Sequence, residues 1–120
     1  MALIDTHTHL YLPEFDIDRH VVVKNALETG IEKMFLPNID SGTIDRLMQL
    51  CLDFPKVFYP MMGLHPGSVK ENYLDELKIV KERISGGQFI AVGEIGIDLY
   101  WDKTFLSQQF SAFEQQIEIA

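Results

Sequence analysis

The 120-residue sequence has a single cysteine, Cys51, so it cannot form an internal disulfide. A lone thiol is typical of a reducing compartment, and we therefore expect the protein to be cytoplasmic. Its apolar residues occur in short runs, none of which reaches the roughly 18 residues of a membrane-spanning helix. Residues 1–5 carry no basic stretch followed by a long apolar core, so we expect neither export nor membrane insertion.

Basic residues are also few. The sequence has 10 Lys and Arg against 18 Asp and Glu, which gives a formal net charge of -8. A protein with this charge has no wide basic surface that would gather nucleic acid through counterion release. Any polyanionic substrate must therefore be held at a local site. The remaining composition, 47% hydrophobic and 23% charged residues, is that of an ordinary globular domain.

Short apolar runs alternate with segments of helical spacing along the whole chain. The runs at 3–4, 34–36, 57–59 and 89–92 predict four buried strands. Apolar residues at helical spacing predict helices around 22–27, 44–51, 74–84 and 106–117. We expect Asp16 or Asp18 to cap the first helix and Ser41 to cap the second. This alternation predicts an α/β fold with a parallel sheet and right-handed crossovers.

The distance between strand ends indicates which α/β architecture is present. The step from His9 to Pro37 is 28 residues, from Pro37 to His65 it is 28, and from His65 to Glu94 it is 29. A barrel of eight βα units in about 250 residues has roughly 31 residues per unit. We therefore predict that residues 1–120 are the N-terminal half, four βα units, of a (β/α)8 TIM-type barrel whose remaining half is absent from this sequence.

The alternative is a small doubly wound sheet that is complete in itself. We favour the half-barrel because the first and fourth strands would otherwise be long apolar edges, which favour aggregation. The last helix also reaches residue 120 without a glycine, a proline or a basic last turn.

Two histidines follow the first strand directly. In the segment at 5–9, His7 and His9 alternate with threonines and therefore point to the same side of the strand end. Two imidazoles at the rim where barrel active sites lie can bind one divalent cation. Asp5 has the same parity. It either orients a ligand by accepting a ring N–H or caps a turn, and both readings stay open.

Further candidates follow the third and fourth strands. Glu94, in the GEIGID motif at 93–98, emerges at the same rim, and its two carboxylate oxygens can bridge two metal ions. His65, in the GLHP motif at 63–66, has its backbone restricted by the following proline. It can be a ligand, a proton donor or a contact for a substrate oxygen. The structural alternative for Glu94 is a surface glutamate in a glycine turn. The structural alternative for His65 is a histidine whose hydrogen bonds are made within the fold.

Other polar and aromatic residues have less specific roles. Asp98 either bonds backbone N–H groups of its loop or supports the metal site. Trp101, with Tyr100, either stacks on a base or packs within the loop. We expect His20 to be a solvated side chain and Cys51 to be buried on an apolar helical stripe.

The sequence has no glycine-rich phosphate loop, no serine with a positioned base and no Cys-x-x-Cys pair. We therefore expect water to be the nucleophile and metal-assisted hydrolysis to be the reaction class. Two metal ions would suit a phosphodiester best. Imidazole ligands suit zinc, manganese or iron, whereas phosphate chemistry with carboxylates suits magnesium or manganese.

These motifs resemble the TatD family of metal-dependent deoxyribonucleases, in the amidohydrolase-like superfamily of (β/α)8 barrels. The resemblance rests on DTHTHL at 5–10, FDxDR at 15–19, GLHP, GEIGID and the later Gln109, Phe113 and Gln116. It covers the whole chain but only the first half of a family member. Tyr11 departs from the family, which often has an aspartate at that position.

The resemblance implies that His7 and His9 bind one metal ion and that Glu94 bridges it to a second. An intact site would then hold two divalent ions, Mg, Mn or Zn. His65 corresponds to a histidine that lies beside the site and is not a usual ligand, so we assign it to substrate contact or acid–base work. The family draws two further histidines and an aspartate, the expected base, from later strands.

The implied function is a divalent-metal-dependent deoxyribonuclease that cleaves DNA phosphodiester bonds with a metal-activated water, on single strands or strand ends. We expect the 120-residue piece alone to be inactive. An amidohydrolase or lactonase acting on a small cyclic substrate is the alternative within enzymes, because one fold supports many chemistries. A non-catalytic metal-binding module is the alternative outside enzymes. Glu94 in the bridging position favours the nuclease type.

Overall fold

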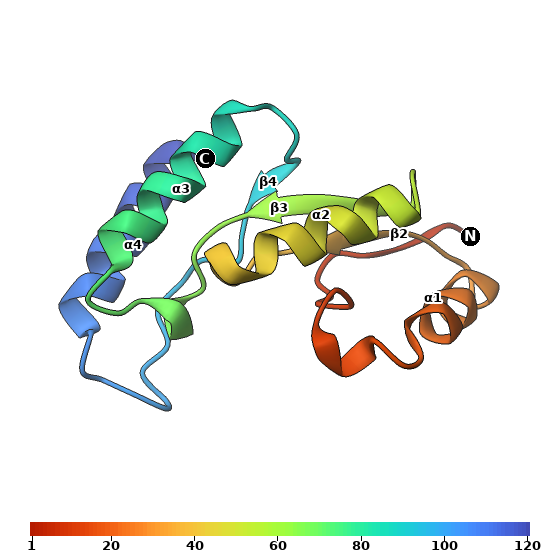
Figure 1. The fold of residues 1–120 in the computed structure, drawn as a ribbon, viewed down its shortest axis with the longest axis horizontal. Coiled ribbons are helices and arrows are strands. Elements are labelled where there is room, and N and C mark those ends of the chain that lie inside the picture. Colours follow the sequence, from red (N-terminus) through yellow and green to blue (C-terminus); the bar gives the residue numbers. More distant parts are fainter.

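The computed structural model describes residues 1–120 as a curled half-barrel of four parallel strands that alternate with helices (Figure 1). Neighbouring strands pair in parallel in the order β1-β2-β3-β4. The strands are β1 (Leu3–Asp5), β2 (Ile31–Leu36), β3 (Phe58–Met62) and β4 (Ala91–Val92). The helices are α1 (Arg19–Glu28), α2 (Ile44–Asp53), α3 (Tyr73–Ser85) and α4 (Leu106–Ile119), with short 3-10 turns η1 (Pro13–Phe15), η2 (Ser41–Thr43) and η3 (Pro66–Ser68). The predicted α/β half-barrel is confirmed.

The helix starts differ in part from the expected caps. Asp18 precedes α1, but its side chain makes no capping hydrogen bond. The prediction that Ser41 caps the second helix is wrong, because η2 intervenes and Asp40 caps that turn by accepting the Gly42 N–H at 2.9 Å. Ser41 lies inside the turn, and its hydroxyl donates to Glu76 of α3 at 2.7 Å. This bond ties the start of the second unit to the third.

Two clusters of buried side chains hold the half-barrel together. The first packs α1 and α2 against β2 and β3 through Leu10, Tyr11, Val23, Met34, Leu36, Leu47, Leu50 and Phe58. The second packs α3 and α4, which lie side by side in Figure 1, against β3 and η3. Its members are Ile44, Met62, Leu64, Val69, Leu77, Val80 and Ala112. The loops that leave β1 and β3 are therefore anchored in the core.

The first and fourth strands are not buried, contrary to the sequence-based prediction. Leu3 and Ile4 of β1 are 45% and 51% exposed, and Ile90 beside β4 is 47% exposed. Each of these strands pairs on one side only, so its outer edge and apolar side chains remain open. By contrast, residues of β3 alternate between buried and half-buried because the strand has neighbours on both sides.

Helix α4 also turns a different face inward than its apolar pattern suggests. Leu106, Phe110 and Ile117 are exposed, whereas Gln109, Ala112 and Gln116 are buried. Beside β4, an apolar hollow of about 480 Å³ lies open between the ends of α3 and α4, lined by Ile84, Phe89, Ile90, Ala91, Val92, Ile119 and Ala120. Together with the exposed side of β1, these groups form two apolar edges.

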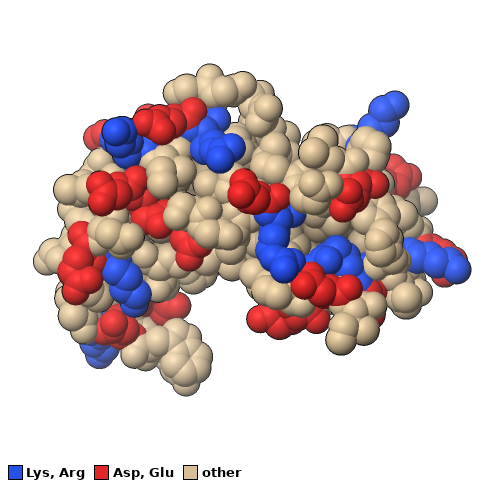
Figure 2. All heavy atoms as spheres, viewed as in Figure 1, with Lys and Arg blue, Asp and Glu red and all other residues tan.

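Charged side chains lie scattered over the face shown in Figure 2, where acidic and basic groups alternate without a continuous basic surface. No helix in the structure is both long enough and apolar enough to span a membrane.

Candidate metal centre

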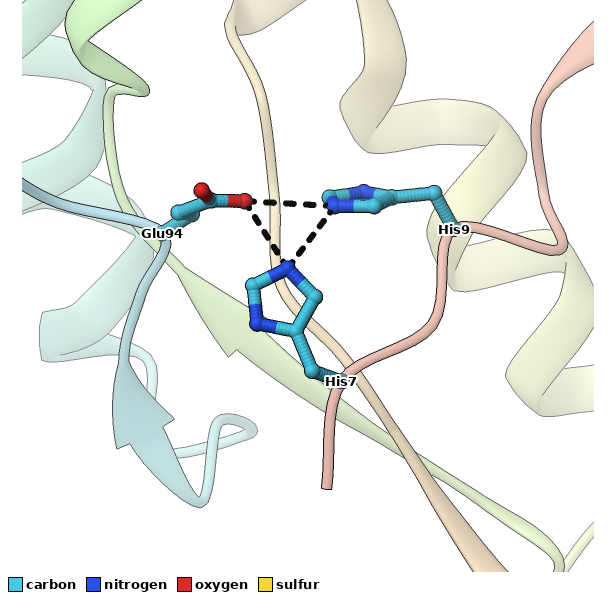
Figure 3. A group of neighbouring side chains, drawn as sticks. All are labelled: His7, His9 and Glu94. Atoms are coloured by element: carbon cyan, nitrogen blue, oxygen red, sulfur yellow. Dashed lines mark hydrogen bonds and ion pairs between the residues drawn. The ribbon is translucent and has the colours of Figure 1, made fainter. Parts of the chain in front are cut away.

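His7, His9 and Glu94 meet at the carboxyl edge of the sheet, where parallel strands end together. Both histidines leave β1 on the following loop, and Glu94 leaves β4, so residues far apart in sequence point toward one another (Figure 3). The Nε2 atom of His7 lies 3.0 Å from Oε2 of Glu94, and the Nε2 atom of His9 lies 3.2 Å from the same oxygen. The two Nε2 atoms are 3.1 Å apart. Three potential ligand atoms thus form a nearly equilateral triangle.

The size of this triangle fits a divalent cation. Metal–nitrogen bonds of about 2.0–2.1 Å place neighbouring ligand atoms roughly 2.9 Å apart in an octahedral site and roughly 3.4 Å apart in a tetrahedral one. The three observed distances lie between these limits. Two imidazoles and one carboxylate also form a donor set that suits zinc or manganese. The residues present can therefore hold a metal ion.

Tyr11 fixes the protonation of His9. Its side chain is buried, and its hydroxyl donates to the Pro37 carbonyl oxygen at 2.5 Å. Burial raises the pKa of Tyr11 far above its ordinary value, so the hydroxyl keeps this proton. The hydroxyl oxygen, 2.8 Å from Nδ1 of His9, then accepts the ring N–H. Nε2 of His9 consequently carries the lone pair and faces the centre.

Burial also keeps the His9 ring neutral. Desolvation lowers the pKa of His9 below its ordinary value, and it outweighs the opposite effect of the Glu94 carboxylate. A neutral imidazole is the form that binds a metal ion. The same burial that packs Tyr11 therefore prepares His9 as a ligand.

His65 lies beside the triangle with both ring nitrogens engaged. Its Nδ1 accepts the Gly67 N–H at 2.9 Å, so the neutral ring carries its proton on Nε2. That Nε2 lies 3.2 Å from Oε1 of Glu94, the carboxylate oxygen that faces away from His7 and His9. A ring in this state has no free lone pair to offer a metal ion. Its N–H can orient Glu94 or contact a substrate oxygen.

The position of Glu94 depends on two buried residues of the neighbouring strand ends. A Cβ on Gly63 would lie 2.8 Å from the carbonyl carbon of Gly93 and 2.9 Å from the carbonyl oxygen of Glu94, closer than real Cβ contacts. Asn38 accepts the Glu94 N–H at 3.1 Å through its backbone, and its amide donates to the Gly63 carbonyl at 3.0 Å. The loop that carries Glu94 is therefore held from two sides.

Two glutamines of α4 hold the loops that carry the other site residues. Gln116 accepts the Leu64 N–H at 2.7 Å and donates to the Leu64 carbonyl at 3.3 Å, directly before His65. Gln109 makes the same pair of bonds with the backbone of Asp98, at 2.8 and 2.9 Å. These backbone contacts explain why α4 buries glutamines in place of its larger apolar side chains.

The structure distinguishes several of the open readings. Asp5 accepts the backbone N–H of His7 at 3.0 Å, and Asp98 accepts that of Tyr100 at 3.0 Å, so both carboxylates stabilise their own loops. His20 is exposed, as expected. Cys51 is partly buried, and burial raises its thiol pKa to about 11, which keeps it protonated and unreactive. Trp101 is 84% exposed, and its ring meets that of Tyr100 edge to face.

Sequence reasoning did not find the supporting roles of Tyr11 and Asn38. Tyr11 shares the parity of His7 and His9, which was a usable signal, but the partner that it bonds to lies at the end of another strand. Asn38 is fully buried directly after β2, and a buried asparagine at a strand end indicates a hydrogen-bonding role.

Comparison with known proteins agrees with this geometry. The sequence profile of the family described as TatD related DNase matches residues 4–120. An uncharacterized metal-dependent hydrolase of Bacillus subtilis, YabD, is 30% identical over 118 residues, which are 98% of this chain and 46% of the relative. A protein of Erwinia tasmaniensis named 3'-5' ssDNA/RNA exonuclease TatD is 25% identical over 118 residues, again 98% of this chain and 46% of the relative.

The fold is similar to that of a solved relative as well. The crystal structure of the TatD homologue YJJV from Escherichia coli superposes with a TM-score of 0.79 at 29% identity, covering 98% of this chain and 46% of that one. The chain thus spans about half the length of the relatives that it matches. A family profile that matches nearly every residue, together with the shared fold, shows that this chain belongs to the TatD related DNase family.

Proposed function

We propose that the protein is a divalent-metal-dependent hydrolase that cleaves phosphodiester bonds of DNA, on single strands or strand ends. The observation that carries this proposal is the triangle of His7, His9 and Glu94, whose size and donor set fit a divalent cation. The relative named as a metal-dependent hydrolase supports the reaction class, and the relative named as an ssDNA/RNA exonuclease supports the substrate class. The cytosol stays the expected location, on the ground of the lone Cys51 thiol.

Each side chain of the centre has its own role in the proposed hydrolysis. His7, His9 and Glu94 would hold the divalent cation, whose chemistry when bound would be to activate water and polarise a phosphoryl oxygen. His7 and His9 supply neutral nitrogens, and Oε2 of Glu94 supplies the negative charge. Oε1 of Glu94 lies 3.2 Å from Nε2 of His65 and is not shared with His7 or His9, so Glu94 would be the residue to hold a second cation if one binds. In this proposal His65 would donate its Nε2 proton to the carboxylate or to a substrate oxygen, which its 3.2 Å distance from Oε1 of Glu94 supports.

We further propose that residues 1–120 are the N-terminal half of the barrel and that further strands complete the site. The chain spans 46% of its relatives, and its two edge strands leave apolar side chains open. Glu94 and the two histidines would supply three ligand atoms to a metal ion, so water, substrate or residues from elsewhere would fill its other positions.

The test is cleavage of a labelled single-stranded oligonucleotide by the full-length protein, with EDTA removal and add-back of Mg, Mn or Zn. We expect metal-dependent cleavage that falls by at least about 100-fold in Glu94→Ala, because the substitution removes one ligand and the only negative charge of the triangle. Glu82→Ala is the matched control, since Glu82 is an exposed glutamate of α3 away from the centre.

Metal titrations separate binding from catalysis. His7→Ala should weaken metal binding, and His20→Ala, which removes an exposed histidine of α1, should leave it unchanged. If the metal-loaded full-length protein leaves DNA intact, the phosphodiesterase proposal is wrong, and small cyclic amides and esters become the substrates to test.

A further inference from the structure

A second hollow lies beside His65, outside the triangle of His7, His9 and Glu94. It has a volume of about 260 Å³ and lies between η3 and the loop that joins β4 to α4. Pro66, the residue directly after His65, forms part of its wall, together with Val69, Trp101 and Phe105. The hollow is therefore apolar on several sides, and its wall begins one residue after His65, whose ring lies 3.2 Å from Glu94.

Trp101 contributes an exposed aromatic ring to the wall of this hollow. The side chain is 84% exposed, and its neighbour Tyr100 is 81% exposed. Their rings meet edge to face, with centroids 4.6 Å apart and planes at 86°. Asp98 and Asp102 hold the loop by accepting backbone N–H groups two residues further on, at 3.0 and 2.8 Å. The loop conformation is thus stabilised while the indole stays largely exposed.

The charge of the hollow selects against phosphate. Two carboxylates, those of Asp98 and Asp102, line it together with one ammonium group, that of Lys70. Lys70 Nζ lies 3.8 Å from the Asp102 carboxylate and 5.4 Å from the centre of the Phe105 ring, so its charge is already partnered. A neutral ring with N–H groups suits this lining, because carboxylates accept hydrogen bonds.

The size of the hollow agrees with one planar ring system. Pockets for drug-sized ligands measure about 300–1,000 Å³, and this hollow lies just below that range. An aromatic face beside a small apolar hollow is the arrangement on which proteins stack single bases of unpaired strands.

We propose that this hollow is a subsite for an unstacked nucleobase of single-stranded DNA, with the base stacked on Trp101. The choice of DNA rests on the proposed function, in which the metal centre on the other side of His65 would hold a phosphodiester of the same strand. A base within a duplex is paired and stacked and cannot enter the hollow. The subsite therefore selects single strands over duplexes.

The test measures binding without cleavage, using the full-length protein in EDTA, where no metal-held phosphate contributes and the base subsite must itself supply the affinity. The probes are a fluorescein-labelled oligothymidylate and an oligomer of the same length made of abasic deoxyribose phosphates, and fluorescence anisotropy gives both dissociation constants. Failure of the natural protein to prefer the oligothymidylate over the abasic oligomer would overturn the subsite. We expect Trp101→Ala to weaken binding of the oligothymidylate by about 5- to 100-fold, as loss of one stacked base does, and to leave binding of the abasic oligomer unchanged.

Two further variants separate stacking from charge. Trp101→Phe keeps an aromatic face and should restore most of the affinity for the oligothymidylate. Lys103→Ala removes an exposed cation from the same loop that does not line the hollow, so it should change both dissociation constants by the same factor. Because Trp101 is exposed, its substitution leaves the packed core intact.

The base subsite and the proposed hydrolysis are tested by different results. If Trp101→Ala binds both oligomers as the natural protein does, or loses both equally, the base subsite is wrong, even if the metal-loaded natural protein cleaves DNA. If the preference for bases depends on Trp101 but the metal-loaded protein does not cleave, the subsite stands and the proposed hydrolysis is wrong.

Discussion

Tyr11 acts on the candidate metal centre through His9 although it is not one of the three candidate ligands. Its hydroxyl accepts from Nδ1 of His9 and donates to the buried Pro37 carbonyl. In Tyr11→Phe, the ring N–H loses its acceptor and the carbonyl loses its donor. We expect metal affinity to fall by about 10- to 100-fold, as it does when the outer partner of a ligating histidine is removed. Calorimetric titration of the full-length protein with zinc or manganese measures the metal affinity.

Tyr59→Phe is the matched control for this loss. Tyr59 is half-buried on β3, and its hydroxyl makes only a 3.4 Å contact with the Lys56 carbonyl. Equal metal affinity in Tyr11→Phe and the natural protein would show that the hydroxyl does not orient His9.

The residue patterns predicted that distant side chains come together, but they did not predict the hydrogen bonds that hold those side chains in position. The parity of His7 and His9 and the strand-end position of Glu94 predicted a shared rim, and the structure brings the three together. Their role as ligands stays a prediction. The supporting roles of Tyr11 and Asn38 were not predicted because their hydrogen-bond partners lie at other strand ends, and only the tertiary structure sets those pairings.

At the scale of elements, periodicity predicted where strands and helices lie but not which face each helix buries. The spacing of apolar residues placed α4 correctly, yet Leu106, Phe110 and Ile117 are exposed. The helix instead buries Gln109 and Gln116 because unpaired backbone groups of two loops need partners. A hydrophobic pattern predicts only which apolar side chains are buried. It therefore does not show that backbone groups of neighbouring loops need hydrogen-bond partners from the helix.

The contribution of the glutamine contacts to stability can be measured at Gln116, whose side chain bonds the backbone of Leu64. Gln116→Leu fills a similar volume but leaves the buried backbone N–H and carbonyl of Leu64 without partners. An unsatisfied buried group costs about 1–3 kcal/mol, so we expect the free energy of unfolding to fall by at least that amount. Urea unfolding of the full-length protein measures it. We also expect slower turnover, because Leu64 precedes His65.

Gln115→Leu serves as the matched control. Gln115 is the neighbouring glutamine of α4, and its side chain bonds only Ser111 and Lys81, near the surface. A loss of stability in Gln115→Leu as large as that in Gln116→Leu would mean that the Leu64 contact is not what holds the helix.

The loop after β1 is tied to two helices by an exposed ion-pair network. Asp16 accepts from Arg46 of α2 at 2.8 and 3.1 Å and from Arg19 of α1 at 2.9 Å. Hydrogen bonds from Arg46 and then Arg19 lower the pKa of Asp16 to about 2. Because this pKa lies below that of the unfolded chain, the network stabilises the fold above about pH 4 and loses its effect as the pH falls toward 2.

We therefore expect Asp16→Asn to lower the melting temperature slightly at neutral pH, since exposed pairs are screened by water and salt. The difference from the natural protein should shrink below pH 4 and vanish only below about pH 2, where Asp16 is protonated in the folded state as well. Asp18→Asn, which removes a neighbouring carboxylate without an ion pair in the structure, should show no such convergence. Thermal melts of the full-length proteins across this pH range provide the check.

At the scale of the whole molecule, the apolar edges show how incomplete the buried surface of residues 1–120 is. Only 23 of the 120 residues are buried, and the exposed large apolar side chains include Leu3 and Ile4 on β1 and Ile90 beside β4. The regular spacing of strand ends predicted four barrel units, and the parallel order confirms them. The burial of the first and fourth strands could not be predicted from composition, because it depends on what lies beside them.

We expect residues 1–120, expressed alone, to associate through these edges, to bind metal weakly and to hydrolyse DNA at no more than a trace of the full-length rate. Exposed apolar strand edges pair with other chains, and three ligand atoms on one side of a cation hold it less tightly than a completed site. Light scattering, metal titration and the oligonucleotide assay, each run beside the full-length protein, measure the three expectations. A monodisperse monomer that melts cooperatively would contradict the half-barrel proposal. Metal-dependent turnover by the short chain at enzymatic rates would show that His7, His9 and Glu94 need no further strands.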